Sequence, residues 1–288
     1  MIVWNLSIIL NVIESSVSLK RQPLLNYLFC MSSILLEIKN NIASITFNRP
    51  EKFNAFNREM ALAFQKVLDD CENNSSIRCV YLSGAGKAFC AGQDLSEITD
   101  PDGPGMEKIL KEHYNPIVIK IRNLSKPVIA AVNGVAAGAG ANIALCCDVV
   151  IATQSAFFIQ AFSKIGLIPD NAGTYFLPRL IGMQKASAFM MLGDKISAQE
   201  AERTGMIYKF FADKNFKKEA EKIAFTLAEM PTKGLAYTKQ ALNKSIENTL
   251  EQQLHSEDQL QQKAALTKDF KEGVAAFLEK RKPKFTGE

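Results

Sequence analysis

Residues 84–94 read GAGKAFCAGQD and follow an apolar run, Cys79–Leu82, that is typical of a buried strand. No Gly-Lys-Ser/Thr closes the segment, so it lacks the spacing of a phosphate-binding loop. What remains is a turn of small residues, whose backbone can approach a ligand closely and direct N–H groups toward it. The segment therefore predicts a ligand-facing turn at the end of a strand.

A second turn of small residues, NGVAAGAGAN at 133–142, follows another apolar run, Val128–Val132. Two turns that each present an amide are the parts of an oxyanion hole, although such turns can also serve only to pack a helix against a sheet. Gly138-x-Gly140 is also part of a dinucleotide-binding pattern, Gly-x-Gly-x-x-Gly/Ala. The last position of that pattern is occupied by Ile143, and Asp148 lies too close in the sequence to be the acid that binds the ribose. The sequence favours an oxyanion hole over a dinucleotide site.

The composition is that of a soluble globular protein of one or two domains, with 288 residues, 47% hydrophobic and 22% charged. A formal net charge of +4 is too small to indicate nucleic-acid binding. The six cysteines lack metal or disulfide spacing, so we expect small apolar residues in a reducing compartment and no metal site. His113 and His255 are expected on the surface, which leaves few candidates for Ser-His or Cys-His catalysis.

The first thirty residues differ from the rest of the chain. They contain no apolar stretch long enough to span a bilayer, and their basic pair, Lys20-Arg21, comes too late for a secretory signal. We expect residues 1–30 to be an extension outside the fold, with Met31 as the native start and a cytoplasmic location. An organelle-targeting peptide at 1–30 is the alternative.

The remaining pattern alternates strands with helices, which predicts the α/β class. Ile34–Ile38 and Ile42–Phe47 form a hairpin pattern, and Asn57 can cap the helix that follows. A helix is predicted over 107–124, with a kink near Pro116.

The last third of the sequence reads as helical from Gly182 to its end. Ser197 and Glu200 have the spacing of a capping box at the start of one of these helices.

Five motifs at matching spacing give the chain from 31 to 288 a specific resemblance to the enoyl-CoA hydratase/isomerase (crotonase) superfamily. They are Asn48-Arg49-Pro50, Phe89–Asp94, Asn133–Gly140, Cys147-Asp148 and Ile165–Asp170. The resemblance implies a crotonase-like ββα spiral core at 31–220 and a helical C-terminal trimerisation region at 221–288, in a homotrimer or a dimer of trimers. It implies an acyl-CoA substrate, with coenzyme A as part of that substrate and no separate cofactor, and neither a nucleic-acid nor a membrane partner.

The resemblance also implies roles for particular residues. The backbone N–H groups of Gln93 and Ala139 would form the oxyanion hole, and Asp170 would be catalytic, although Asp170 could instead only cap the next helix. Hydratases of the family use two glutamates, whose positions here are Asn142 and Phe162. Neither side chain transfers protons as a carboxyl group does, so an isomerase is favoured over a hydratase.

Other segments are similar to the branch of the superfamily that converts the ring epoxide of phenylacetyl-CoA into a seven-membered oxepin in phenylacetate catabolism. They are Ile77-Arg78-Cys79, Gly92–Leu95, Ala137–Ala141 and Glu272–Arg281. In this reading Phe162, Leu167 and Tyr175 form an apolar wall for the ring. The alternatives are a Δ3-Δ2-enoyl-CoA isomerase of fatty-acid oxidation, a non-catalytic acyl-CoA-binding relative and an RNA-binding relative.

The resemblance further implies two sets of substrate and coenzyme A contacts. Within the chain these are Lys52, Phe53, Ala55, Ala91, Asp94, Leu95 and Phe162. Phe277 and Lys280 would contribute from a neighbouring subunit.

Overall fold

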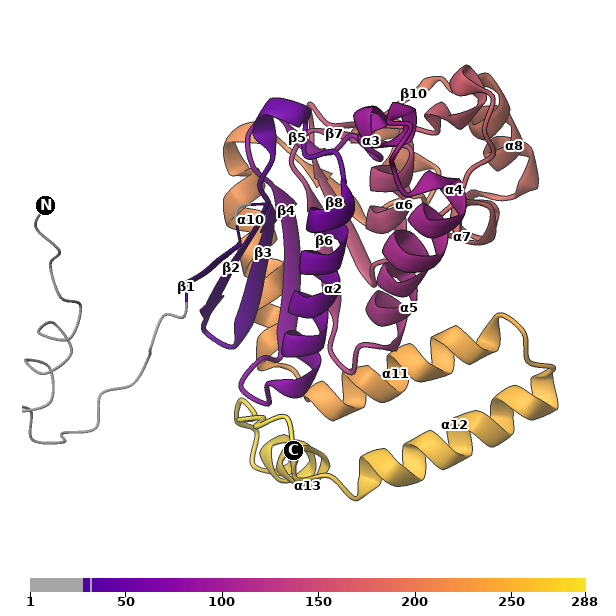
Figure 1. Ribbon diagram of the computed structural model, residues 1–288. Coiled ribbons are helices and arrows are strands. Elements are labelled where there is room, and N and C mark those ends of the chain that lie inside the picture. The colour runs from indigo at the N-terminus through magenta and orange to yellow at the C-terminus, as the bar shows by residue number, and fades with distance from the viewer. Residues whose placement is uncertain (1–27, 32) are drawn as a thin grey trace, which may run out of the picture.

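The computed structural model describes residues 28–31 and 33–288 (Figure 1). Within these residues the strands form a seven-stranded sheet in the order β1-β2-β3-β4-β6-β8-β11 and a four-stranded sheet in the order β10-β9-β7-β5. The large sheet contains β1 (Leu28–Met31), β2 (Ile34–Lys39), β3 (Ile42–Phe47), β4 (Cys79–Gly84), β6 (Val128–Val132), β8 (Val149–Thr153) and β11 (Lys209–Phe211). The small sheet contains β5 (Ala88–Cys90), β7 (Val135–Ala137), β9 (Phe157–Ile159) and β10 (Lys195–Ser197).

The chain winds as a spiral, because it visits the two sheets in alternation. It passes from β4 to β5, from β6 to β7 and helix α6 (Ala139–Leu145), and then from β8 to β9. From β3 onward the neighbouring strands of the large sheet are parallel, as are β5, β7 and β9 in the small sheet. The α/β class and the ββα spiral expected from the sequence are confirmed.

The first elements form as their sequence predicts. Asn40 and Asn41 both have positive φ and close the antiparallel β2–β3 hairpin, a conformation that asparagine tolerates better than most residues. The side chain of Asn57 accepts a hydrogen bond from the Met60 N–H at the start of α2 (Arg58–Asn73).

The main hydrophobic core lies between the two sheets and the helices beside them. Phe47 is at its centre, with its ring edge-to-face against Phe56, Phe64 and Phe89 at centroid distances of 5.1 to 5.3 Å. On the other face of the large sheet, α10 (Asp213–Glu229) buries a row of small residues and Phe216.

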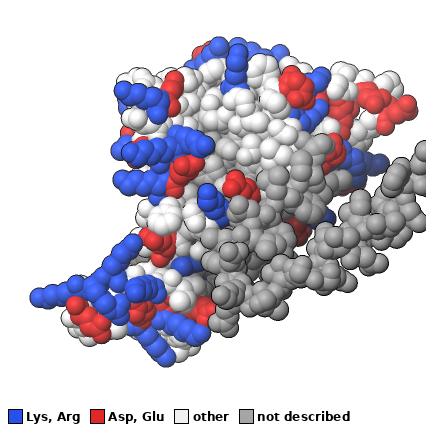
Figure 2. Space-filling model, turned by 90° about the vertical axis from the view of Figure 1, so that its left-hand side faces the viewer, with Lys and Arg blue, Asp and Glu red and all other residues white. Residues whose placement is uncertain are grey.

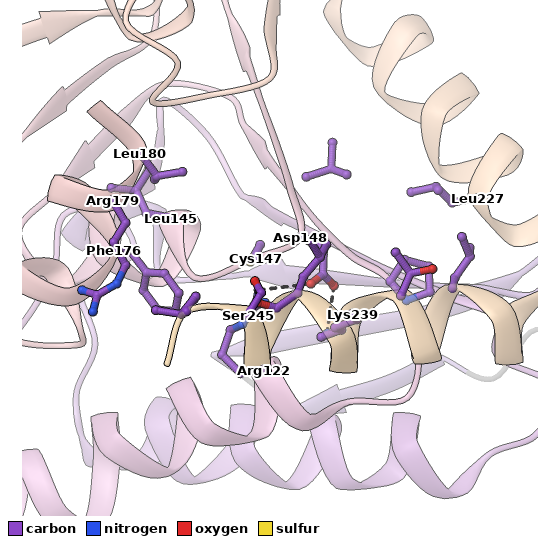
Figure 3. Close-up of a pocket in the computed structure, with 16 residues that line it drawn as sticks. Arg122, Leu145, Cys147, Asp148, Phe176, Arg179, Leu180, Leu227, Lys239 and Ser245 are labelled. Carbon is purple, nitrogen blue, oxygen red and sulfur yellow. Dashed lines mark hydrogen bonds and ion pairs between the residues drawn. The ribbon is translucent and has the colours of Figure 1, made fainter. Parts of the chain in front are cut away.

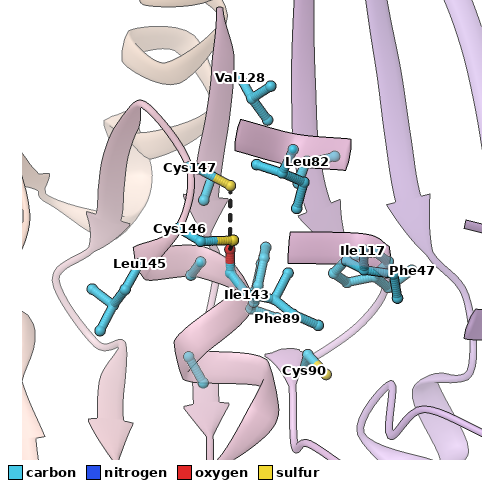
Figure 4. Close-up of a cluster of buried hydrophobic side chains, with 14 of the residues drawn as sticks. Phe47, Leu82, Phe89, Cys90, Ile117, Val128, Ile143, Leu145, Cys146 and Cys147 are labelled. Atoms are coloured by element: carbon cyan, nitrogen blue, oxygen red, sulfur yellow. Dashed lines mark hydrogen bonds between the residues drawn. The ribbon is translucent and has the colours of Figure 1, made fainter. Parts of the chain in front are cut away.

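The five cysteines whose side chains are described are free and buried, in keeping with the expected apolar role. Cys146 and Cys147 both direct their thiols at the carbonyl of Ile143 (Figure 4). Burial raises the pKa of the Cys147 thiol well above its ordinary value, so this cysteine stays protonated.

The helix predicted over 107–124 is divided into α4 (Gly105–Lys108), a π-helical turn η2 (Ile109–Tyr114) and α5 (Asn115–Asn123). The irregular π turn ends just before Pro116, which stands in the first turn of α5, where a missing N–H costs little. The π turn buries His113 and Tyr114. The surface position predicted for His113 is therefore wrong, whereas His255 is exposed as expected.

The region after Gly182 is not helical throughout. Its helices α8 (Met183–Leu192) and α9 (Ala198–Arg203) are accompanied by β10 and β11, which extend the two sheets. These strands are too short to show an alternating pattern in the sequence. The Ser197 hydroxyl caps α9 by accepting from the Glu200 N–H, but the Glu200 carboxylate pairs with lysine and arginine side chains instead of completing a capping box.

The last three helices form a C-terminal arm made of α11 (Thr232–Ser245), α12 (Leu250–Ala265) and α13 (Lys268–Leu278), which runs beneath the body (Figure 1). Arg78, the residue before β4, donates hydrogen bonds to both ends of the arm: to Met230 O at 2.6 Å and Thr232 Oγ1 at 2.9 Å where α11 begins, and to Phe285 O at 2.9 Å after α13. The helix α10 crosses the predicted boundary at residue 220 and packs on the large sheet.

The predicted extension at 1–30 lies mostly outside the described residues, and its end contributes Leu28–Cys30 to β1, which pairs with β2. None of the described helices is both long enough and apolar enough to cross a membrane. Lys and Arg side chains are interspersed with Asp and Glu over the described part of the face in Figure 2.

Candidate active site

Three connections follow β5, β7 and β9, the three parallel strands of the small sheet. Because parallel strands end at the same edge of a sheet, the segments that leave them lie close together. The first carries Gln93, the second Ala139 and the third Asp170. The topology thus brings the three predicted catalytic positions to one edge.

The orientation of the Gln93 amide follows from its pairing with Phe56. Phe56 N donates to Gly92 O at 2.7 Å, and Asp94 N donates to Phe56 O at 2.8 Å. Successive N–H groups of an extended segment point to opposite sides, so the N–H of Gln93 points away from Phe56. Within the described residues it meets no acceptor.

The Ala139 amide is left free by the start of α6. The first intrahelical bond runs from Asn142 N to Gly138 O, which leaves the N–H of Ala139 without a helix partner. Gly138 has φ of +51° and ψ of −124°, a conformation that in practice requires glycine.

The two turns pack directly against each other. A Cβ added to Gly92 would stand 2.9 Å from Ala137 O and 3.3 Å from Ala139 N, and one added to Gly140 would stand 2.3 Å from Cys90 O. The glycines are needed for this approach, which brings the two free amides side by side.

Asp170 is held by its backbone and not by its carboxyl group. Its carbonyl accepts from Asn142 Nδ2 and from Gly173 N, both at 2.8 Å. Its Oδ1 is buried and has no hydrogen-bond partner among the described residues. Burial raises the pKa of the Asp170 carboxyl to about 6. Asp170 does not cap α7 (Gly173–Ile181), because the N-cap is Ala172.

Gln93, Ala139 and Asp170 line one cavity of about 220 Å³. Ala91, Leu95, Phe162 and Leu167, all predicted to contact substrate, also lie on its wall. The rest of the lining is largely apolar and includes Ile98, Met106, Ile109, Tyr114 and Ile165. Two free amides and one desolvated carboxyl in an apolar cavity can stabilise an oxyanion and move a proton beside it.

Comparison with known proteins decides the family. The enoyl-CoA hydratase/isomerase family model matches residues 37–288. The chain is 46% identical to the 1,2-epoxyphenylacetyl-CoA isomerase of Escherichia coli K12, over 89% of this chain and 99% of that protein. The chain belongs to the enoyl-CoA hydratase/isomerase family.

Other relatives in this family are named as hydratases. A Rhodobacter capsulatus protein named as an enoyl-CoA hydratase is 44% identical, over 88% of this chain and 98% of the relative. A solved enoyl-CoA hydratase/isomerase structure from Mycobacterium abscessus superposes with a TM-score of 0.83 at 34% identity, over 88% of this chain and 100% of that chain. The chain is therefore an acyl-CoA hydratase/isomerase of the crotonase superfamily.

Asn142 and Phe162, which the sequence resemblance puts at the positions of the hydratase glutamates, make the following contacts. Asn142 is fully buried, donates to the Asp170 carbonyl and accepts from Gln160 Nε2 at 2.7 Å. Phe162 faces Gly138, where an added Cβ would stand 3.7 Å from its ring. Asn142 therefore fixes the Asp170 backbone, and Phe162 contributes its ring to the cavity wall.

Several residues predicted to bind coenzyme A lie beside the cavity without lining it. Phe53 is half exposed, and its carbonyl accepts from Ala91 N, which places Lys52, Phe53 and Ala55 next to the first turn. Asp94 is buried in an ion pair with Arg49 at 2.9 Å.

Burial alone would raise the pKa of the Asp94 carboxyl, but hydrogen bonds from Ser96 and Arg49 hold it below its ordinary value.

Tyr175 was predicted to line the cavity but does not. Its ring stacks under the Arg179 guanidinium at 3.9 Å instead. Phe277 lies on α13 of the arm and Lys280 follows that helix, and their predicted role depends on a neighbouring subunit.

Sequence reasoning missed Tyr114, whose hydroxyl donates to Gln93 Oε1 at 2.9 Å. The only sequence signal for an irregular turn at Tyr114 was the nearby Pro116. A short π turn shows no hydrophobic periodicity that would have predicted it.

A larger hollow of about 680 Å³ lies between the body and α11 (Figure 3). Asp148 pairs there with Arg122 at 3.1 Å and with Lys239 at 2.8 Å, so these charges compensate one another. In the part of the chain that is described, no group of three or more His, Cys, Asp or Glu side chains could hold a metal ion.

Proposed function

We propose that this protein is an acyl-CoA isomerase. The thioester carbonyl would accept hydrogen bonds from the N–H groups of Gln93 and Ala139, and Asp170 would move the proton. One observation carries the proposal: a carboxyl group whose Oδ1 has no hydrogen-bond partner among the described residues shares the cavity with two free amides. The family resemblance adds that an amide and a phenyl group stand where hydratases would have glutamates.

The chemistry follows from these three groups. Removal of a proton next to the thioester carbonyl places negative charge on the carbonyl oxygen, where two preorganised amides stabilise it. With a pKa of about 6, Asp170 is ionised at neutral pH and basic enough to take the proton. Isomerisation needs only one such group, because the same residue can return the proton to another carbon. Hydration would need a second group to activate water.

The proposed substrate is 2-(1,2-epoxy-1,2-dihydrophenyl)acetyl-CoA, converted to oxepin-CoA in phenylacetate catabolism. Its support is the relative of that activity at 46% identity, together with an apolar cavity whose wall includes Phe162 and Leu167. An aliphatic Δ3-Δ2-enoyl-CoA isomerase is the second candidate, because the same three groups would shift a double bond.

The proposed assembly is a homotrimer or a dimer of trimers built through the C-terminal arm. Large apolar side chains are exposed along its helices, among them Leu254, Leu266, Phe270, Phe277 and Leu278. In such an assembly Phe277 and Lys280 would reach the coenzyme A of a neighbouring copy.

A comparison of substrates tests the proposed function. The purified protein is given the ring-epoxide acyl-CoA, an aliphatic 3-enoyl-CoA and a 2-enoyl-CoA in separate assays. Isomerised products are identified by NMR spectroscopy, and mass spectrometry detects any addition of water. We expect rapid rearrangement of the ring epoxide without change of mass and negligible addition of water to the 2-enoyl-CoA. Efficient hydration, or no reaction with either isomerisable substrate, would contradict the proposal.

A further inference from the structure

Tyr114 contacts both sides of the backbone bridge that orients the Gln93 amide. Its ring packs against Phe56, the bridge partner of Gln93, with centroids 6.1 Å apart. Its hydroxyl donates to Gln93 Oε1 at 2.9 Å. A single side chain of the π turn η2 thus touches the residue that carries the oxyanion amide and the residue that fixes its direction.

The other end of the Gln93 side chain is held as well. Its Nε2 donates to Glu97 Oε2 at 2.7 Å, and Glu97 Oε1 accepts from the N–H of Arg58 at 2.8 Å. The amide group of Gln93 is therefore held between Tyr114 and Glu97, and it cannot rotate without breaking a bond at each end. This immobilises the residue whose backbone faces the substrate.

Tyr114 is suited to hold a fixed position. Its side chain is 1% exposed, and burial raises the pKa of its hydroxyl well above the ordinary value, so it stays a neutral donor. The π turn makes this placement possible, because His113 and Tyr114 are both directed into the protein.

We propose that Tyr114 is a positioning residue for the oxyanion hole, acting through the side chain of Gln93 to fix its backbone N–H. The inference rests on the proposed function, since it assumes that this amide binds a thioester carbonyl.

Carbonyl infrared spectroscopy provides a test that does not depend on turnover. Phenylacetyl-CoA labelled with ¹³C at the thioester carbonyl is bound to the wild-type protein and to the Tyr114→Phe variant. Hydrogen bonds from the oxyanion hole should lower the carbonyl stretching frequency of the bound ester. We expect Tyr114→Phe to keep the affinity for the ester but to lose part of this shift, with kcat for isomerisation about three- to tenfold lower.

Two further variants separate positioning from folding. Gln93→Leu removes the acceptor of the Tyr114 hydrogen bond and keeps the backbone amide of residue 93. It should therefore reduce the carbonyl shift as Tyr114→Phe does. The double variant should be no worse than either single one. Tyr81→Phe removes a hydroxyl from β4 that packs with the α10 cluster and does not line the cavity, so it should behave as the wild type.

Each outcome decides the proposal. A full carbonyl shift in both Tyr114→Phe and Gln93→Leu would overturn the positioning role. Weaker ester binding with an unreduced shift would also overturn it, because Tyr114 would then contact the substrate itself. If the carbonyl band of the ester is unshifted even in the wild-type protein, both the oxyanion hole and the positioning role of Tyr114 are overturned.

Discussion

Asp170 combines a fixed backbone with a carboxyl group whose Oδ1 has no partner among the described residues. Two donors hold its carbonyl, one from Asn142 and one from Gly173. The sequence showed that Asn142 could not act as the glutamate of a hydratase, but not what it does, because its contact with Asp170 spans 28 residues. Only the folded chain shows that this amide supports the carboxyl group left in the site.

Replacing Asn142 with alanine should change both rate and pH dependence. The lost side chain leaves a polar space that water can enter beside Asp170, which should lower the pKa of its carboxyl from about 6 toward the ordinary value. We expect kcat to fall about tenfold to a hundredfold and the acid limb of its pH profile to move to lower pH. Measuring kcat from pH 4 to 9 tests this.

The matched control is Asn243→Ala on α11, which also removes an amide donor to a backbone carbonyl, that of Arg122. It should leave the pH profile unchanged. An unchanged profile and rate in Asn142→Ala would show that Asn142 only fills space.

At the scale of elements, the sequence predicted turns and helix starts correctly where one or two residues determine the local backbone conformation. The Asn40-Asn41 hairpin, the Asn57 cap and the two glycine turns all have local causes in the sequence. Prediction failed where packing decides, as in the three-residue strands β10 and β11 and the π turn that buries His113. Short or irregular elements carry too few residues to show a period.

The contact between α6 and the first turn predicts a severe effect of Gly140→Ala. The new Cβ would stand 2.3 Å from Cys90 O and 2.7 Å from Cys90 Sγ, so the two turns must separate and their amides with them. We expect a loss of roughly 1–3 kcal/mol in the free energy of unfolding and a fall in kcat of about a hundredfold. Guanidinium denaturation and steady-state kinetics measure the two effects.

Gly234→Ala serves as the control, because its Cβ would have room, with Pro231 Cγ at 3.5 Å, inside the helix α11. It should be neutral or slightly stabilising and fully active. Equal behaviour of the two alanine variants would contradict the requirement for close approach of the turns.

At the scale of the whole molecule, the site is a product of topology. Gln93, Ala139 and Asp170 are far apart in the sequence and meet because β5, β7 and β9 end at one edge. Periodicity and spacing could predict the strands and the two small turns, and suggested that the turns together form an oxyanion hole. That Asp170 joins them was expected only from the resemblance to a family. The arm was predicted as helical, but its course beneath the body depends on tertiary contacts such as those of Arg78.

The central claim is that Asp170 moves the proton, and Asp170→Asn tests it most directly. The folded carboxyl has its pKa raised above that of the unfolded chain, so ionisation costs stability as pH rises from about 4 through 6. The variant should therefore be more stable than the wild type at pH 7, by on the order of 1–3 kcal/mol, and equally stable below pH about 4.

The decisive measurement is kcat of Asp170→Asn at pH 7 with the ring-epoxide acyl-CoA, alongside its affinity for phenylacetyl-CoA. We predict a fall of about 10² to 10⁴ in kcat with ester binding retained. Wild-type turnover in this folded variant would contradict the account.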